Sequence, residues 1–176
     1  LIIGAGPAAV AAAVFTARAN LKTLVIGEPK KSMLISAADL GNYIGTDMTG
    51  ISIIAGSMQT IGVSIMMSAN GNTVGGTGFG EGNVISGNKG TTDGFGVYLA
   101  SAAGGSNTVI GNIIGPQKDG LSYLTSSPQT HGLMIDNCPN NIVGGNSANA
   151  RNIISGNEAY GIYVNGASST GNTIKG

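Results

Sequence analysis

From Gly41 onward the sequence repeats itself with a period of about 70 residues, and this repeat restricts the fold more than any other feature. Segment 71–76 (GNTVGG) returns at 140–145 as NNIVGG, and segment 82–88 (GNVISGN) returns at 151–157 as RNIISGN, both at an offset of 69. Short β-branched strands between Gly and Asn turns, repeated at this spacing, are typical of a parallel β-helix. A β-sandwich or β-roll built from the same short strands is the alternative.

A smaller unit within each long repeat indicates the number of coils. A strand that begins with glycine occurs four times, and each is followed 9 to 11 positions later by a strand that begins with asparagine. The glycines are Gly62, Gly96, Gly132 and Gly161, and the asparagines are Asn72, Asn107, Asn141 and Asn172. We therefore predict about four coils over residues 41–176, with inward Val, Ile and Leu in stripes and the asparagines hydrogen-bonded to their counterparts in neighbouring coils. Because segment 171–176 stops within a repeat unit, we expect the β-helix to be truncated at its C-terminus.

The opening 28 residues follow a different pattern. A short apolar run at 1–3 leads directly into Gly4-x-Gly6-x-x-Ala9, and an Ala-rich segment at 8–20 is followed by a second apolar run at 21–26. Small residues at these three positions allow a tight turn, a close approach of the backbone to a pyrophosphate and close packing of helix on strand. Glu28 lies 22 positions beyond Gly6, where an acid can accept hydrogen bonds from a ribose. The order strand, turn, helix, strand and acid predicts a dinucleotide-binding βαβ unit, and a plain βαβ unit that uses its glycines only for packing is the alternative.

This segment also resembles a known family. Segments 2–9 (IIGAGPAA), 17–26 (ARANLKTLVI) and 42–45 (NYIG) are similar to the N-terminal FAD-binding segment of thioredoxin reductases, in the pyridine nucleotide-disulfide oxidoreductase family. The resemblance implies FAD as cofactor, bound through its ADP moiety, with Glu28 near the adenosine ribose, although family members usually carry this acid where the chain has Gly27. It also implies that the pyrophosphate lies against Gly4, Gly6, Pro7, Ala8 and Ala9. The chain has one cysteine and no second glycine fingerprint for NADPH, so a complete reductase is excluded.

Segment 41–65 fits both patterns. It contains the NYIG match to the reductases, and it also keeps the offset of 70 to the later repeats, in which GNYIG at 41–45 returns as GNIIG at 111–115. A period maintained over 25 positions is harder to obtain by chance than a short match, so we assign the segment to the β-helix. The predicted fold class is mixed: a short Rossmann-like βαβ segment (1–28), a linker (29–40) and a right-handed parallel β-helix (41–176). The repeats of this β-helix resemble those of bacterial surface and secreted proteins.

Composition narrows the classes of partner. The formal net charge is zero and only 9% of residues are charged, with no basic cluster larger than Lys30-Lys31. Binding of nucleic acid needs concentrated cations, so we expect no nucleic-acid partner. No apolar stretch reaches the roughly 20 residues of a transmembrane helix, so we predict no membrane span. The lone cysteine, Cys138, is expected to be a buried structural thiol.

Charged side chains are scattered along the repeats without a two-carboxylate motif, so we predict no catalytic and no metal-binding residues. They are Asp47, Glu81, Asp93, Asp119, Asp136 and Glu158, with Lys89, Lys118, Arg151, Lys175 and His131.

The sequence predicts specific contacts or surroundings for some residues of the repeats. Glu81 and Arg151 flank equivalent strands and are expected to form a surface ion pair. We expect His131, at a turn before a core strand, to be solvated. Tyr98 and Tyr163 occupy equivalent positions and are predicted to share one ladder, for which packing is the common role and a sugar-binding platform the alternative.

Three functional hypotheses follow from these observations. The first is an FAD-binding or ADP-binding fragment of a thioredoxin-reductase-like oxidoreductase fused to a β-helix, with adenine dinucleotide as partner and redox catalysis incomplete in this chain. The second is a secreted or cell-surface β-helix that serves as a structural or carbohydrate-interaction module for a polysaccharide, with the βαβ segment as an N-terminal cap. The third is an artificial or recombinant chimera with no joint function. The first indicates the cytoplasm and the second the cell exterior, so no localisation is predicted.

Overall fold

The chain divides into two compact units, Leu1–Gly41 and Asn42–Gly176. The computed structural model describes residues 2–3, 25–26, 42–46, 50, 52, 59–100, 104–125 and 128–176. The division at 1–28, 29–40 and 41–176 stays a prediction. Among the residues described, no helix is long and apolar enough to cross a bilayer.

In the first unit, the two predicted strands pair with each other. Strand β1 (Ile2–Ile3) lies parallel to β2 (Val25–Ile26), with Ile2 opposite Val25 and Ile3 opposite Ile26. Parallel pairing is the arrangement that a βαβ unit requires. The helix predicted at 8–20 and the linker predicted at 29–40 lie outside the described residues.

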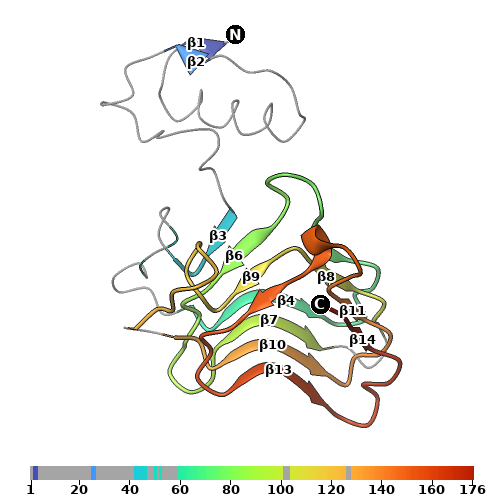
Figure 1. Cartoon of the computed structure of the whole chain (residues 1–176). Coiled ribbons are helices and arrows are strands. Elements are labelled where there is room, and N and C mark those ends of the chain that lie inside the picture. Colours follow the sequence, from blue (N-terminus) through green and yellow to red (C-terminus); the bar gives the residue numbers. More distant parts are fainter. Residues whose placement is uncertain are drawn as a thin grey trace. The chain divides into compact units, whose positions relative to one another are not determined.

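The second unit is a stack of parallel strands in three sheets, and these strands lie side by side in Figure 1. One sheet contains β3 (Asn42–Ile44), β6 (Asn83–Ile85), β9 (Ile113–Ile114) and β12 (Ile153–Ile154). The next contains β4 (Ile61–Met66), β7 (Phe95–Ala100), β10 (His131–Asp136) and β13 (Tyr160–Asn165). The third contains β5 (Thr73–Gly75), β8 (Thr108–Ile110), β11 (Ile142–Val143) and β14 (Thr173–Ile174), and a 3₁₀ turn, η3 (Ala148–Ala150), precedes β12.

The chain visits the three sheets in the same order four times, which gives a mainly-β, β-helix-like stack of four coils. Val97 pairs with Val63 in the preceding coil and with Leu133 in the following coil, which pairs in turn with Ile162. The offset of 69 in the sequence therefore corresponds to two coils. The parallel pairing excludes the antiparallel β-sandwich.

Strand β3 belongs to this stack. Asn42 lies opposite Asn83 and Ile44 opposite Ile85, with parallel pairing to β6. The assignment of these residues to the β-helix, rather than to the reductase-like segment, is thus confirmed for residues 42–44.

Inward side chains of the three sheets form one apolar core. Neighbouring residues on a strand point to opposite faces, so each short strand contributes one or two residues to the interior. The core includes Ile85, Val97, Leu99, Val109, Ile114, Leu133, Ile135 and Val143. Cys138 is a free thiol buried in the same cluster, as predicted from the sequence.

Buried asparagines connect each coil to the next. The side-chain amide nitrogen of Asn72 donates to Oδ1 of Asn107 at 3.0 Å, Asn107 donates to Asn141 at 3.1 Å, and Asn141 donates to Asn172 at 2.9 Å. Each Oδ1 also accepts from the backbone N–H of the preceding asparagine. The predicted asparagine ladder is therefore confirmed, and it satisfies polar groups in a part of the interior that excludes water.

A second ladder lies at the start of the sheet that contains β6 and β9. Asn83 Nδ2 donates to Asn112 Oδ1 at 2.8 Å, and Asn112 Nδ2 donates to Asn152 Oδ1 at 3.1 Å. This ladder was not predicted from the sequence, although an asparagine recurs there directly before each strand's apolar residues, at Asn83, Asn112 and Asn152.

We predict that Asn107→Ala lowers the free energy of unfolding by roughly 2 to 4 kcal/mol, because it removes a fully buried amide that accepts from the backbone and side-chain N–H groups of Asn72 and donates to Asn141. Asn72→Ala is the matched control, since Asn72 ends the same ladder and is exposed. Its effect should stay below about 1 kcal/mol. Urea unfolding followed by circular dichroism measures both, and equal losses in the two variants would contradict the ladder's role.

Candidate functional site

The residues predicted to bind the cofactor are Gly4, Gly6, Pro7, Ala8, Ala9 and Glu28. All of them lie outside the described residues, as does Asp47. The assignment of an FAD pyrophosphate site to these positions stays a prediction.

A repeated glycine shapes the sheet of β4, β7, β10 and β13. A Cβ at Gly96 would lie 2.6 Å from the carbonyl oxygen of Gly132 and 2.7 Å from Cγ2 of Ile114, so no side chain fits there. The equivalent Gly62 and Gly132 are similarly crowded, by Gly96 O at 2.6 Å and by Gly161 O at 2.5 Å. These glycines occupy inward positions, where a side chain would interrupt the stack.

Aromatic rings gather on the outside of this sheet. Phe95 and Tyr98 stack at 5.2 Å between ring centroids, and Tyr160 and Tyr163 stack at 5.0 Å. His131 lies between the two pairs, 5.1 Å from Phe95 and 5.4 Å from Tyr160, nearly parallel to both rings. The faces of the inner rings are covered by their neighbours along the ladder. Packing is therefore the role that this geometry favours for Phe95 and His131, whereas Tyr160 and Tyr163 on β13 are 54% and 36% exposed.

The expectation of a solvated His131 is wrong. The residue is only 9% exposed, because its ring fills the gap between Phe95 and Tyr160. Its Nε2 lies 3.9 Å from Oδ1 of Asp93, and its Nδ1 is buried without a hydrogen-bond partner. The sequence placed His131 correctly at the start of a core strand, but neighbouring aromatic residues in adjacent coils decided its burial.

Tyr98 and Tyr163 lie in one column, as predicted, but Met134 separates them. The Tyr98 hydroxyl donates to Oδ2 of Asp136 at 3.2 Å. Burial raises the pKa of Tyr98 above its usual value, and the nearby Asp136 charge and this hydrogen bond raise it further.

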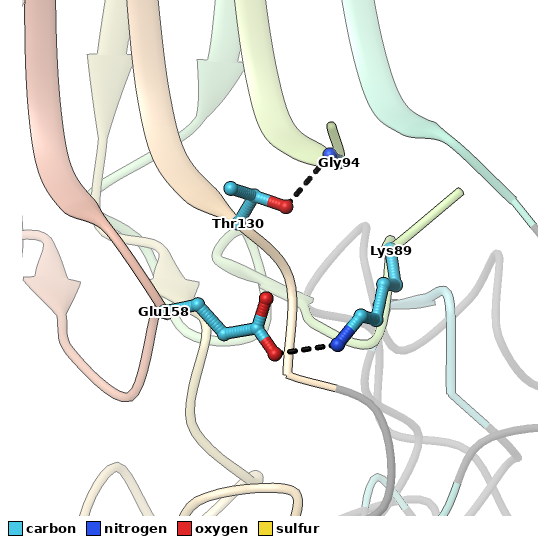
Figure 2. A network of polar contacts seen from close by, with 4 residues as sticks. All are labelled: Lys89, Gly94, Thr130 and Glu158. Atoms are coloured by element: carbon cyan, nitrogen blue, oxygen red, sulfur yellow. Dashed lines mark hydrogen bonds and ion pairs between the residues drawn. The ribbon is translucent and has the colours of Figure 1, made fainter. Parts of the chain in front are cut away.

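One ion pair spans two coils. Lys89 Nζ pairs with Glu158, and in Figure 2 this pair lies beside the Thr130 hydroxyl, which accepts from the backbone N–H of Gly94 at 3.1 Å. The two charged residues are 69 positions apart, which is the repeat offset, so the sequence contained the signal for this contact. Both side chains are substantially exposed, and such pairs contribute little stability.

The expected ion pair between Glu81 and Arg151 does not form among the described residues. Oε2 of Glu81 instead accepts a hydrogen bond from the backbone N–H of Gly78 at 2.7 Å. A Cβ at Gly76 or Gly78 would lie 2.3 Å or 2.7 Å from the Glu81 side chain. Glu81 therefore braces the glycine-rich loop 76–82 instead of pairing with Arg151.

Asp119 organises a separate turn. Its carboxylate accepts from the backbone N–H groups of Leu121 and Ser122 and from the Ser122 hydroxyl. The Ser122 hydroxyl lowers the pKa of Asp119 most, and the backbone donors of Ser122 and Leu121 lower it further.

Among the described residues, no group of three His, Cys, Asp or Glu side chains is arranged to hold a metal ion.

The braced loop forms one wall of a groove with a volume of about 470 Å³. Val84, Ile113 and Ile153 line its floor, one from each of β6, β9 and β12, and they are aligned by the strand register. Their neighbours on the same strands point into the core, so these three side chains point outward. The floor extends roughly 10 Å along the coil stack, two spacings of about 4.8 Å.

The walls supply an aromatic ring and a cation. Phe79, at the tip of loop 76–82, is 88% exposed and lines one side. Ala148 and Asn149 of η3 and the following Arg151 also line the groove. An apolar floor with an exposed ring and a few convergent polar groups is the usual composition of a ligand site. This site was not predicted from the sequence, although a single Phe between glycines outside the repeated strands was its signal.

Comparison with known proteins gives one partial similarity. The chain is 36% identical over 59 residues to an alkyl hydroperoxide reductase subunit of Escherichia coli (strain K12), a match that covers 34% of this chain and 11% of the relative. The similarity supports the oxidoreductase resemblance of part of the chain, while the chain spans only about a tenth of the relative's length. No family model matches, and no solved structure matches.

We predict that Glu81→Ala increases hydrogen exchange at the Gly78 amide about tenfold, since a charge-assisted bond worth about 1.4 kcal/mol is lost. Glu81→Gln keeps an acceptor oxygen and should retain most of the protection. Amide exchange measured by NMR compares the three proteins. Identical Gly78 exchange in all of them would show that Glu81 does not brace the loop.

Proposed function

We propose that the second unit is a non-catalytic carbohydrate-binding module, a right-handed parallel β-helix that binds a polysaccharide in the groove beside Phe79. The groove is the single observation that carries this proposal. Its apolar floor follows the coil stack, and an extended chain of sugars can lie along it.

The chemistry of the groove suits a sugar better than a wholly apolar ligand. A sugar ring has an apolar C–H face and polar edges, and Phe79 offers a ring face that no other aromatic residue in the described part of the chain stacks upon. Asn149 and the glycine backbone of loop 76–82 provide hydrogen-bonding groups around it. The aromatic ladder of β7, β10 and β13 instead serves packing in this proposal.

Replacing Phe79 by Ala should weaken polysaccharide binding about tenfold, a loss of about 1.4 kcal/mol, because the exposed stacking surface is removed. Leu121→Ala is the matched control, since Leu121 is 89% exposed and does not line the groove. Isothermal titration with a panel of soluble neutral and acidic polysaccharides measures the affinities. The proposal fails if no polysaccharide binds, or if both variants bind as the unmodified protein does.

A second function is proposed for the first unit: binding of the ADP moiety of FAD. The glycine motif, the parallel register of β1 and β2, and the partial similarity to a reductase support it. In this proposal Gly4, Gly6, Pro7, Ala8 and Ala9 contact the pyrophosphate and Glu28 contacts the ribose. The two proposed functions are independent, and neither requires catalysis by this chain.

Gly6→Val should abolish ADP and FAD binding, because a branched side chain blocks the approach of the backbone to the pyrophosphate. Isothermal titration with ADP and with FAD tests this, together with the absorbance spectrum of the protein as isolated. Thermal unfolding of the β-helix should remain nearly unchanged and serves as the control. Retained nucleotide binding by the variant would refute the assigned site.

A further inference from the structure

Arg151 lies at the junction of two hollows. It lines the groove that contains Phe79, and it also lines a second hollow of about 390 Å³. Ala148 is likewise shared by both, while Ser147 and Lys175 line the second. A polymer that extends from the groove into the second hollow would therefore contact Phe79 and both cations.

The charges of these two cations are not balanced within the described residues. No carboxylate there lies within 4.0 Å of Arg151 or of Lys175, whereas Lys89 is paired with Glu158. Glu81, which carries the carboxylate of loop 76–82, accepts a hydrogen bond from the Gly78 N–H. Both cationic side chains are exposed beside the hollow, so a ligand with negative charges would complement them.

We propose, on the basis of the proposed carbohydrate-binding function, that the ligand is an acidic polysaccharide whose carboxylates contact Arg151 and Lys175. The guanidinium of Arg151 presents parallel donors that match a carboxylate in two-point contact, and the Lys175 ammonium adds a second point charge. The neutral part of the same chain lies along Val84, Ile113 and Ile153, beside Phe79.

The charge of the whole chain favours a polysaccharide over nucleic acid. The protein carries eight Lys and Arg residues against eight Asp and Glu residues. Two neighbouring cations suffice for a sparsely charged sugar chain, but they do not form the extended basic surface that a phosphate backbone requires. Sulfate groups on a polysaccharide share the anionic character of carboxylates, so both sources belong in the test.

The test uses four polymers: polygalacturonate, its fully methyl-esterified neutral form, dextran and dextran sulfate. The full chain should bind polygalacturonate at least tenfold more tightly than the ester. Arg151→Gln and Lys175→Gln should each reduce that preference several-fold, and the double variant should remove it. Lys118→Gln is the charge-matched control and should leave the preference intact, because Lys118 is exposed and lines neither hollow.

The outcomes separate the two claims. Equal affinity for polygalacturonate and its ester, unchanged in the Arg151 and Lys175 variants, overturns the acidic ligand and leaves the carbohydrate function standing. Preference for dextran sulfate with no binding of polygalacturonate overturns the carboxylate assignment. Absence of binding to all four polymers overturns the carbohydrate function and this inference with it. Circular dichroism of each variant confirms that the exposed substitutions leave the fold intact.

Discussion

The hydrogen bonding between coils is the constraint on which the rest of the second unit depends. Each strand inside a sheet pairs with a strand from the coil before and a strand from the coil after, so neighbouring coils must have nearly the same shape. At the turns, the asparagine amides continue that pairing: Asn107 accepts from Asn72 and donates to Asn141. A buried amide is costly when unpaired and favourable when matched, which makes the ladder a requirement for register as well as a source of stability. Loops between the strands are free of this constraint, and loop 76–82 lines the groove together with residues of β6, β9 and β12.

The outer surface follows from the same regularity. Because the parallel strands pair in register, outward residues of successive coils fall in aligned columns, and the rings of Phe95, His131 and Tyr160 stack on one another. That stacking covers the ring faces of Phe95 and His131. Phe79 differs because it belongs to a glycine-rich loop outside the columns, and Glu81 fixes that loop through Gly78. Phe79 is therefore an exposed ring in a loop that departs from the repeat, in contrast to the stacked rings of Phe95 and His131.

Periodicity predicted the fold well and the site poorly. The recurrent strand that begins with glycine placed Val63, Val97 and Leu133 in one stripe, and the recurrent Asn72 and Asn107 predicted the ladder, because both depend on similar contacts repeated from coil to coil. The burial of His131 and the side-chain direction of Glu81 depend on neighbours that do not repeat, so equivalent sequence positions were misleading there. The groove combines a loop near position 79 with a 3₁₀ turn near position 149, and no local pattern connects them. The nucleotide site of the first unit remains a prediction from the sequence, based on Gly4, Gly6 and their neighbours.

The central claim is that the ligand surface of the second unit is the groove between loop 76–82 and Arg151, not the aromatic ladder. Chemical-shift mapping of the isotopically labelled chain during titration with a galacturonate oligosaccharide tests this most directly. If the ligand binds in the groove, the largest chemical-shift changes are expected at the backbone amides of Gly78, Phe79, Asn149 and Arg151, with little change at Tyr98 and Tyr163. Shifts concentrated on Tyr98, His131 and Tyr163 would contradict it and assign binding to the ladder.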